Sequence, residues 1–434
     1  MKKDINQILD NPANIKIYFL PWLIAVSFIL RLLAIFFVRD VHIDNEWGGL
    51  LNNLVQYKSY SLYTFDGQLI PSTLLPPIYP FFLYLIKVIT SFKETNFLYS
   101  IFFIQIILST YSVYLFYQIN QNFFSNKLSL INSIIYSVVP LNIYACAQIS
   151  SVNLQIIFSL LFLKFLFLIL KKQSKKNILI FSIISGLLIL TRGEFVLIFF
   201  LMLFFIILSK KIKLINLIKI VMVVFLVVSP YLVRNYIHFN QIFLVKSLGY
   251  NLWKGNNELS PVSGYEILER NEFPNLTSKL NNLEKNKYYE INRDNIYFNE
   301  AISNLNKDSF RYFKLFFKKL FSYYFIDVDP SYPNYVKYKR KIDINSKYQN
   351  YYIFYHIIPI MILSILSFPG LFIFFKMNKF ENKCLGLYLF SNLIIFSIFF
   401  ILPRYKFAIL PVQIILAAHF IQYMLNKFNV KKNL

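Results

Sequence analysis

The sequence predicts an all-α polytopic membrane protein with about ten transmembrane helices, surface helices in the first outer loop and a mostly helical outer subdomain. Three observations predict this fold class. Of the 434 residues, 57% are apolar and only 15% are charged, whereas soluble domains carry roughly 25% charged residues. Apolar runs close to the ~20 residues needed to span a bilayer recur along the chain. Clusters of lysine separate these runs.

The charge balance supports a membrane protein and not a nucleic-acid-binding one. The chain carries 45 Lys and Arg against 21 Asp and Glu, a net charge of +24. Lysines between apolar runs hold helix ends on the cytoplasmic side of a membrane, which explains the excess without nucleic acid. Both cysteines, Cys146 and Cys384, fall inside apolar runs, so we expect no disulfide framework. The chain shows no Gly-rich phosphate loop, which argues against a cytoplasmic site that uses nucleotides.

Eleven apolar runs are candidates for transmembrane helices. They occupy residues 17–38, 76–92, 97–118, 128–147, 149–170, 177–191, 194–209, 214–233, 352–375, 384–402 and 405–425. Lysines gather in the connectors at residues 171–176, 210–213 and 376–383 and in the tail at residues 427–432. The positive-inside rule places all of these clusters, and the lysines near the N-terminus, in the cytoplasm.

One early candidate, residues 76–92, is expected not to span. If all eleven runs crossed the membrane, the lysines at residues 171–176 and 210–213 would face outward. The run at 76–92 is short, begins with Pro76 and Pro77, and carries a lysine in its middle. As a helix on the outer membrane surface, it leaves ten spans in the plasma (inner) membrane. Both chain termini and every lysine cluster are then cytoplasmic.

The same topology divides the chain into three parts. Residues 1–233 form a transmembrane core that includes a first outer loop at 39–96. Residues 234–350 form an outer, periplasmic subdomain, and residues 351–434 form the C-terminal transmembrane helices. Aromatic and charged residues alternate with helical spacing over about residues 283–324, which indicates an ordered subdomain. The N-terminal run lacks a small-residue cleavage site, so we expect it to be a retained first span.

Two carboxylates, Asp44 and Glu46, stand where the first span leaves the membrane on the outer side. Such a pair beside an apolar helix end is about as often a solvated junction as a site. The surroundings favour a site, because an amphipathic run and a Pro-rich aromatic segment follow. The apolar spans carry almost no other acid. A carboxylate held partly desolvated at an interface suits general-base chemistry on a hydroxyl.

Three arginines are predicted to lie on the same outer side as these carboxylates. Arg192 occupies a turn together with Glu194, Arg234 follows one span, and Arg404 precedes the last span. Each arginine alone is more often an interfacial anchor whose charge reaches water. Together they would suit a phosphate, because guanidinium binds phosphate oxygens through two parallel hydrogen bonds. Arg31 lies inside the first span and requires a carboxylate, a water or a lipid phosphate as partner.

Five motifs in order along the chain resemble those of the polytopic GT-C type glycosyltransferases. This group includes the protein O-mannosyltransferases and the bacterial lipid A aminoarabinose transferases. The resemblance is closest to the bacterial branch that takes sugars from polyprenyl phosphate. The motifs, in order, are Asp44, Glu46 and Asn53-Leu54; Pro76, Pro77, Tyr79 and Pro80; Leu190, Thr191, Arg192 and Glu194; Pro230, Tyr231, Arg234, Asn235 and Tyr236 with Gly249, Asn251, Leu252, Trp253, Gly255, Asn256 and Asn257; and Arg404, Tyr405 and Pro411.

The resemblance implies a membrane glycosyltransferase that moves a sugar from a polyprenyl-phosphate donor to a lipid, glycan or protein acceptor on the outer face of the membrane. It implies inversion at the sugar, with Asp44 as general base beside Glu46. The resemblance leaves open whether these two carboxylates bind Mg²⁺ or Mn²⁺.

The resemblance also suggests which residues bind the substrates. The donor phosphate is expected at Arg404, Arg234 and Arg192. The expected substrate contacts are Tyr79, Tyr405, Trp253 and Asn256. The chain departs from the family in one outer turn. Many relatives have an acid between spans three and four, where this chain has Ser150, Ser151 and Asn153.

Two other functions compete with this interpretation. A lipid-linked glycan polymerase or a flippase of the cell envelope is also many-spanning and basic. A flippase needs a polar cavity through its bundle, whereas these spans contain few charges beyond Arg31, Lys87 and Lys164. A non-enzymatic membrane scaffold would leave the ordered set of polar motifs unexplained.

Overall fold

The computed structural model describes residues 12–40, 43, 46–91, 93–265, 272–326, 357–377 and 379–432. All regular elements of these residues are helices except for one two-stranded hairpin. In chain order they are α2 (Pro12–Val38), α3 (Glu46–Tyr57), β1 (Ser61–Phe65), β2 (Gln68–Pro71), α4 (Ile78–Ile89), α5 (Glu94–Asn120), α6 (Asn126–Val138), α7 (Pro140–Ala145), α8 (Val152–Lys171), α9 (Lys175–Thr191), α10 (Phe195–Ser209), α11 (Leu214–Phe239), α12 (Leu248–Gly255), α13 (Pro274–Asn281), α14 (Tyr289–Lys307), α15 (Ser309–Phe321), the π-helical turn η1 (Ser322–Ile326), α18 (Ile358–Lys376), α19 (Phe380–Ile398), the 3₁₀ turn η3 (Pro403–Tyr405) and α20 (Lys406–Lys432). The expected all-α polytopic fold class is confirmed.

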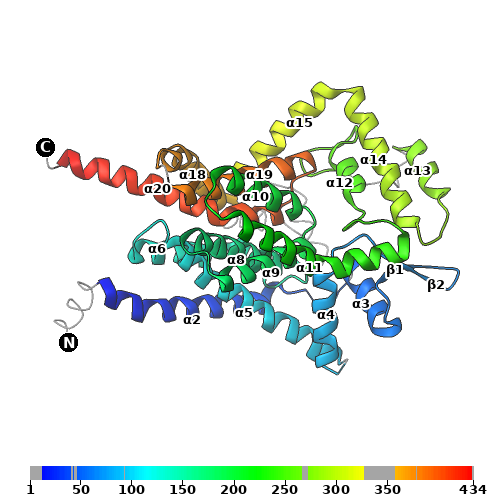
Figure 1. Ribbon diagram of the computed structural model, residues 1–434, viewed down its shortest axis with the longest axis horizontal. Helices are drawn as coiled ribbons and strands as arrows, with labels where there is room; N and C mark the ends of the chain where they lie inside the picture. Colours follow the sequence, from blue (N-terminus) through cyan, green and yellow to red (C-terminus); the bar gives the residue numbers. More distant parts are fainter. Residues whose placement is uncertain are drawn as a thin grey trace.

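The long helices lie side by side in a bundle whose two ends differ (Figure 1). The first turn of α2 and the last turn of α20 lie at the same end of the molecule. Helices α12 to α15, the hairpin and α3 lie at the opposite end, which we call the loop end. The start of α2 and the end of α20 are thus separated by the length of the bundle from helices α12 to α15, which we call the loop subdomain.

Six helices in the described part of the chain are long and apolar enough to cross a membrane. They are Phe19–Val38, Asn96–Asn120, Val152–Lys171, Leu214–Phe239, Ile358–Lys376 and Pro403–Phe428. Helix α10 is apolar but has only 15 residues, and α9 has 17. The chain is therefore a multi-pass membrane protein, and the count of ten spans stays a prediction.

Two early segments show how proline shapes the bundle. Helix α4 begins directly after Pro77 and has 12 residues, about 18 Å of helix. It is too short to span, as expected of residues 76–92. The run at 128–147, expected to be one span, is instead divided into α6 and α7 at Val139. Pro140 causes the break, because proline has no N–H and forces the preceding residue out of the helical region.

The bundle is built around α8. In this helix 72% of the most apolar stretch is buried, against 22% in the first span. Helix α8 packs against α5, α9 and α20, and Leu160, Leu163 and Leu166 on it are almost fully buried. The first span keeps most of its apolar surface exposed, as a helix on the lipid-facing side of a bundle does.

The first outer loop folds into α3, the hairpin and α4. The strands pair antiparallel, with Phe65 opposite Gln68 and Tyr63 opposite Ile70. Asp66 and Gly67 both have positive φ, 48° and 78°, which are the angles of the two-residue turn that matches strand twist. At the start of α3 a Cβ on Gly48 would lie 2.2 Å from the carbonyl oxygen of Ile43. The backbone of Ile43 therefore lies directly against the first turn of α3, where only glycine leaves room for it.

The loop subdomain depends on two close approaches of α12. A Cβ on Gly249 would lie 2.0 Å from the carbonyl oxygen of Asp294, and one on Gly255 would lie 1.8 Å from that of Phe399. The backbone N–H of Tyr250 donates to Asp294 Oδ1 at 2.9 Å, so a carboxylate of α14 caps the N-terminus of α12. Both glycines are thus required by packing of α12 against α14 and the end of α19.

Arg31 is fully buried in α2 and makes its hydrogen bonds to hydroxyls and carbonyls. Its Nε donates to Ser109 Oγ at 2.7 Å, and Nη1 donates to Ser27 Oγ at 2.6 Å and to the Ser137 carbonyl at 3.3 Å. These acceptors come from α5, from α2 itself and from the end of α6. The partner that the sequence left unnamed is thus a set of neutral groups on three helices.

Candidate functional site

Two of the predicted arginines lie near enough at the loop end of the bundle to interact electrostatically. Arg192 follows the last residue of α9, and its Nε donates to Gln155 Oε1 in the first turn of α8 at 2.9 Å. Arg404 lies in η3, immediately before α20, and is exposed. The charge of Arg404 acts on Arg192, as do Glu194 and Tyr405. Three segments distant in sequence therefore build one polar cluster.

The electrostatics of this cluster favour an anion. Burial lowers the pKa of the Arg192 guanidinium, and the charge of Glu194 raises it. The charge of Arg404 lowers this pKa by less than Glu194 raises it, and Tyr405 has a still smaller raising effect. Two guanidinium groups close enough to disfavour each other's charge are stabilised by an anion that contacts both. Because guanidinium matches phosphate oxygens in paired hydrogen bonds, the arrangement suits a phosphate.

The position of Arg404 is fixed by its neighbour in the sequence. Tyr405 is buried and its ring stacks on Phe396 of α19 at 4.4 Å between centroids. The Tyr405 carbonyl accepts a hydrogen bond from Tyr323 Oη at 2.9 Å. The Arg404 guanidinium lies 5.7 Å from the Tyr405 ring centroid. An exposed cation is thus presented from a turn held rigidly by its neighbour.

Of the two predicted acids, one is described. Asp44 lies outside the described residues. Glu46 is the first residue of α3 and is exposed. Another acid that sequence reasoning missed, Asp40, is buried, and its Oδ2 accepts from the backbone N–H of Ile149 at 2.9 Å. Asp40 thereby ties the end of α2 to the connection before α8, and its place as the first acid after the span was the available signal.

Arg234 lies in a different network from Arg192 and Arg404. Its Nη1 donates to the Ser72 carbonyl at 2.8 Å, and Nη2 donates to the Tyr60 carbonyl at 3.1 Å. Its guanidinium lies 5.3 Å from the Tyr60 ring centroid. These contacts tie the last turns of α11 to the first outer loop. A phosphate contact for Arg234 stays a prediction. In the structure, this residue connects α11 to the first outer loop.

The same loop is held from the other side by Glu290 of α14. Ser72 Oγ donates to Glu290 at 2.9 Å, Thr73 Oγ1 donates at 2.8 Å, and the Thr73 N–H donates as well. Burial raises the pKa of Glu290, while these hydrogen bonds and the charge of Arg234 lower it. The segment Ser72–Thr73 is therefore clamped between α11 and the loop subdomain.

The predicted substrate contacts Trp253 and Asn256 are part of the packing. Trp253 is fully buried, with Phe273 and Tyr297 at 5.2 and 5.0 Å between ring centroids. Asn256 Nδ2 donates to the carbonyls of Leu252 and Ile398 at 2.9 and 2.8 Å. Contact of either side chain with substrate stays a prediction, and in this structure both hold α12 in place.

Tyr79 is buried where α3 meets α4. Its ring meets Trp47 edge to face, with 5.0 Å between centroids, and stacks with Phe82 at 5.8 Å.

Gln155, the acceptor for Arg192, was missed by sequence reasoning. The signal was a polar residue in the first turn of an otherwise apolar run.

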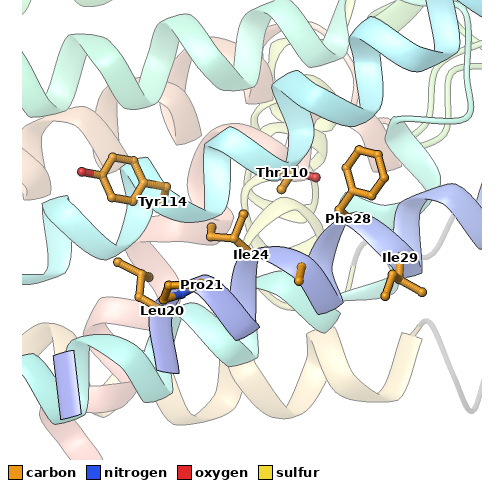
Figure 2. A pocket seen from close by; sticks show the side chains of 8 residues that line it. Leu20, Pro21, Ile24, Phe28, Ile29, Thr110 and Tyr114 are labelled. Carbon is orange, nitrogen blue, oxygen red and sulfur yellow. The ribbon is translucent and has the colours of Figure 1, made fainter. Parts of the chain in front are cut away.

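An apolar groove of about 730 Å³ lies elsewhere, between α2 and α5. Figure 2 shows Leu20, Ile24 and Phe28 of α2 along the groove, with Thr110 and Tyr114 of α5 on the facing helix. Apart from the hydroxyls of these two residues the lining is hydrocarbon, so the groove offers contact to an apolar chain and no acid or base for catalysis.

The described residues do not bring together a metal site. Within the ranges given above, no three His, Cys, Asp or Glu side chains are grouped to hold an ion. The expected pair of Asp44 and Glu46 is not tested by this observation, since Asp44 is not among those residues.

Comparison with known proteins gives one family match. Residues 75–233 match the family model described as dolichyl-phosphate-mannose-protein mannosyltransferase. The matched region includes Tyr79, Arg192 and Glu194, and it is less than half of the chain. No curated protein sequence matches the chain.

Solved structures match over nearly the whole chain. The archaeal oligosaccharyltransferase AglB from Archaeoglobus fulgidus, in complex with an inhibitory peptide and a dolichol-phosphate, aligns with 96% of this chain at 12% identity and a TM-score of 0.54. The apo form of that oligosaccharyltransferase aligns with 96% at 13% identity and a TM-score of 0.51. ArnT from Cupriavidus metallidurans, bound to undecaprenyl phosphate, aligns with 91% of this chain and 77% of its own at 8% identity, with a TM-score of 0.45.

The two oligosaccharyltransferase matches confirm the fold expected from the motifs. The chain spans about half the length of the oligosaccharyltransferase structures, 51% and 52%. The similarity in structure and the family match over residues 75–233 agree on the same membrane core.

Proposed function

Starting from the GT-C type glycosyltransferase fold that this chain has, we propose that it transfers a sugar from a polyprenyl-phosphate donor to a hydroxyl of an envelope acceptor. The observation that carries the proposal is the convergence of Arg192 and Arg404 in one cluster at the loop end. Each residue belongs to a different family-like motif, and the fold brings the two motifs together. The loop end is then the outer face of the membrane, with both chain termini in the cytoplasm.

The arginine pair is proposed to stabilise the leaving group, polyprenyl phosphate. As the bond between the anomeric carbon and the phosphate oxygen breaks, negative charge builds up on polyprenyl phosphate. Arg404 is exposed in a turn whose position is fixed by Tyr405, and Arg192 is held by its hydrogen bond to Gln155. Both guanidinium groups are proposed to contact that phosphate. Fixed positive charges where negative charge develops are an effective form of transition-state stabilisation.

Asp44 is proposed as the general base for the acceptor. Its carboxylate takes the proton of the acceptor hydroxyl while that oxygen forms a bond to the anomeric carbon from the face opposite the phosphate. The sugar configuration is inverted in this single displacement. Glu46, exposed at the start of α3, is suited to orient the acceptor or Asp44. If Mg²⁺ or Mn²⁺ takes part, these two carboxylates are the proposed ligands, and activity would then be lost with EDTA and restored by the ion.

The experiment is mass spectrometry of envelope glycans and polyprenyl-linked sugars in a deletion strain complemented with wild type, Asp44→Asn or Asp66→Asn. Asp66→Asn is the matched control, because it makes the same change in the same loop, at the exposed hairpin turn. We expect one sugar to disappear from a glycan and its lipid-linked donor to accumulate. Wild type and Asp66→Asn should restore the sugar, whereas Asp44→Asn should lower transfer by about 10²- to 10⁴-fold, as loss of a general base does.

Two results would contradict the proposal. Full restoration by Asp44→Asn at equal protein level would remove the general-base assignment. Loss of a whole polymer, or accumulation of a lipid-linked sugar on the cytoplasmic side, would instead identify a glycan polymerase or a flippase.

A further inference from the structure

Helix α15 exposes an apolar stripe and buries one lysine together with Tyr312 and Leu315. Its exposed face is a stripe of four phenylalanines, Phe310, Phe313, Phe317 and Phe321, which are 67, 61, 51 and 53% exposed. Its buried face contains Lys319, which is fully buried and donates to the Gly255 carbonyl at 2.9 Å. An exposed apolar stripe of this size marks a surface that is covered in the working protein.

The position of α15 decides what covers the stripe. The helix leaves the bundle obliquely at the loop end and joins α14 (Figure 1). Directly after Phe321, the turn η1 is fastened to the membrane spans. Tyr324 Oη and Ser367 Oγ of α18 are hydrogen-bonded at 2.8 Å, and Lys406 Nζ at the start of α20 donates to the Tyr323 carbonyl at 2.9 Å. Ser367 lies in the middle of α18 and Lys406 at the start of α20, so the stripe begins beside two apolar spans and continues away from them.

Basic residues border the phenylalanine stripe on one side. At 100° per residue, Lys314 and Lys318 lie next to the stripe on the helix surface, and both are exposed. Lys314 Nζ lies 4.3 Å from the Phe310 ring centroid. Aromatic rings with lysines at their edge are the pattern of helices that lie in a membrane interface, where the lysines meet anionic headgroups.

We propose that α15 is an interfacial helix whose phenylalanine stripe is inserted into the lipid leaflet at the loop end, with Lys314 and Lys318 at the level of anionic headgroups. The loop subdomain would thus be held to the membrane at a second place besides the spans. Its height above the bilayer would be fixed by α15 on one side and by Glu290 and the first outer loop on the other.

The test places a nitroxide label on single cysteines of the full chain in vesicles of phosphatidylethanolamine and phosphatidylglycerol. Both native cysteines, Cys146 and Cys384, are fully buried, so the introduced position reacts selectively. Phe313→Cys and Phe317→Cys report on the stripe. Lys307→Cys on α14 is the aqueous control, 62% exposed, and Phe225→Cys in α11 is the lipid control, 63% exposed.

We expect labels at positions 313 and 317 to be accessible to oxygen and protected from a water-soluble nickel chelate, as at position 225. Accessibility to nickel equal to that at position 307 would overturn the proposal. Protection from both reagents would overturn it too, because it would show that protein, such as a second copy, covers the stripe. Phe310→Cys and Phe321→Cys repeat the test if either first variant fails to fold by gel filtration.

A charge reversal tests the headgroup part separately. In Lys314→Glu with Lys318→Glu, the protection from nickel at position 317 should fall in vesicles containing phosphatidylglycerol. In vesicles of phosphatidylcholine alone the same change should have a smaller effect. An equal effect in both vesicles would show that the lysines do not meet anionic lipid.

Discussion

Replacing Arg404 by alanine is expected to weaken binding of polyprenyl phosphate without unfolding the protein. The side chain is exposed, and the packing of its turn depends on Tyr405, whose ring stacks on Phe396. Removing the guanidinium therefore leaves the turn in place. It also relieves the charge that lowers the pKa of Arg192, so Arg192 alone faces the phosphate in the variant.

The magnitude follows from the bonds that are lost. Hydrogen bonds to charged groups contribute about 1.5–3 kcal/mol each. Because the Arg404 side chain is exposed, the lower part of this range applies to each bond, and one or two bonds to a phosphate are removed. With each 1.4 kcal/mol equal to a factor of ten, the dissociation constant should rise roughly ten- to hundred-fold. Arg404→Lys keeps the charge but not the paired geometry, and should lie in between.

The assay is native mass spectrometry of the purified protein in detergent with polyprenyl phosphate and, in parallel, with the polyprenol that lacks the phosphate. Affinity for the polyprenol should be the same in wild type and variant. Lys307→Ala is the matched control, since it removes one exposed positive charge from the loop end away from the cluster. Its affinity for both lipids should equal that of wild type.

Two outcomes would refute the reasoning. Unchanged affinity of Arg404→Ala for polyprenyl phosphate would show that the phosphate does not bind at the arginine pair. An equal loss of affinity for the polyprenol would show that the variant damages the site for the lipid chain and not for the phosphate.

Two further predictions concern the loop subdomain. Gly249→Ala should destabilise the protein by about 1–3 kcal/mol and lower its apparent Tm, because the new Cβ would lie 2.0 Å from the Asp294 carbonyl oxygen. Gly193→Ala, whose Cβ meets one side chain at 3.2 Å, should change the Tm little. Equal effects of the two substitutions would argue against the close approach at Gly249. Burial lowers the pKa of Lys319 from 10.5 to about 7. Between these two pH values the unfolded chain binds more protons than the folded one, so stability should rise as the pH rises from about 7 toward 10.5. Lys319→Met should lose this rise in apparent Tm, although it also loses the bond to Asn256 Oδ1; a variant with the wild-type pH profile would contradict the assignment.

The helical bundle was largely predictable because its signal is local. An apolar run of about 20 residues has few alternatives to a membrane helix. The short α4 was predictable for a similar reason, since Pro76 and Pro77 fix its start. The helix break at Val139 was missed although Pro140 indicates the end of a helix, because residues 128–147 are apolar on both sides of the break.

The β-hairpin was missed because it is short and surrounded by helices. Its sequence signal was Asp66-Gly67 between two apolar stretches, a strong short-range hairpin pattern. An amphipathic run and a Pro-rich segment on either side led to an expectation of surface helices alone. The hairpin depends on contacts with α14 for its place, since Arg293 Nη1 donates to Tyr63 Oη at 3.0 Å.

For the candidate site, the sequence could propose residue types but not their grouping. Arg192, Arg234 and Arg404 look alike in the sequence, each following or preceding an apolar run. The structure brings Arg192 and Arg404 together and gives Arg234 carbonyl partners instead. Trp253 belongs to a specific motif and is fully buried. From the sequence alone, a motif required for packing cannot be distinguished from one that contacts substrate.

Arg31 has a consequence for the way the chain enters the membrane. A guanidinium near the centre of a single span costs about 2.5–3.5 kcal/mol on insertion. The groups that offset this cost in the finished bundle include Ser109 and Ser137, which are 78 and 106 residues further along the chain. The first span therefore leaves the ribosome well before its partners exist. It gains its full stability in the bilayer only when α5 and α6 have been synthesised and have assembled against it.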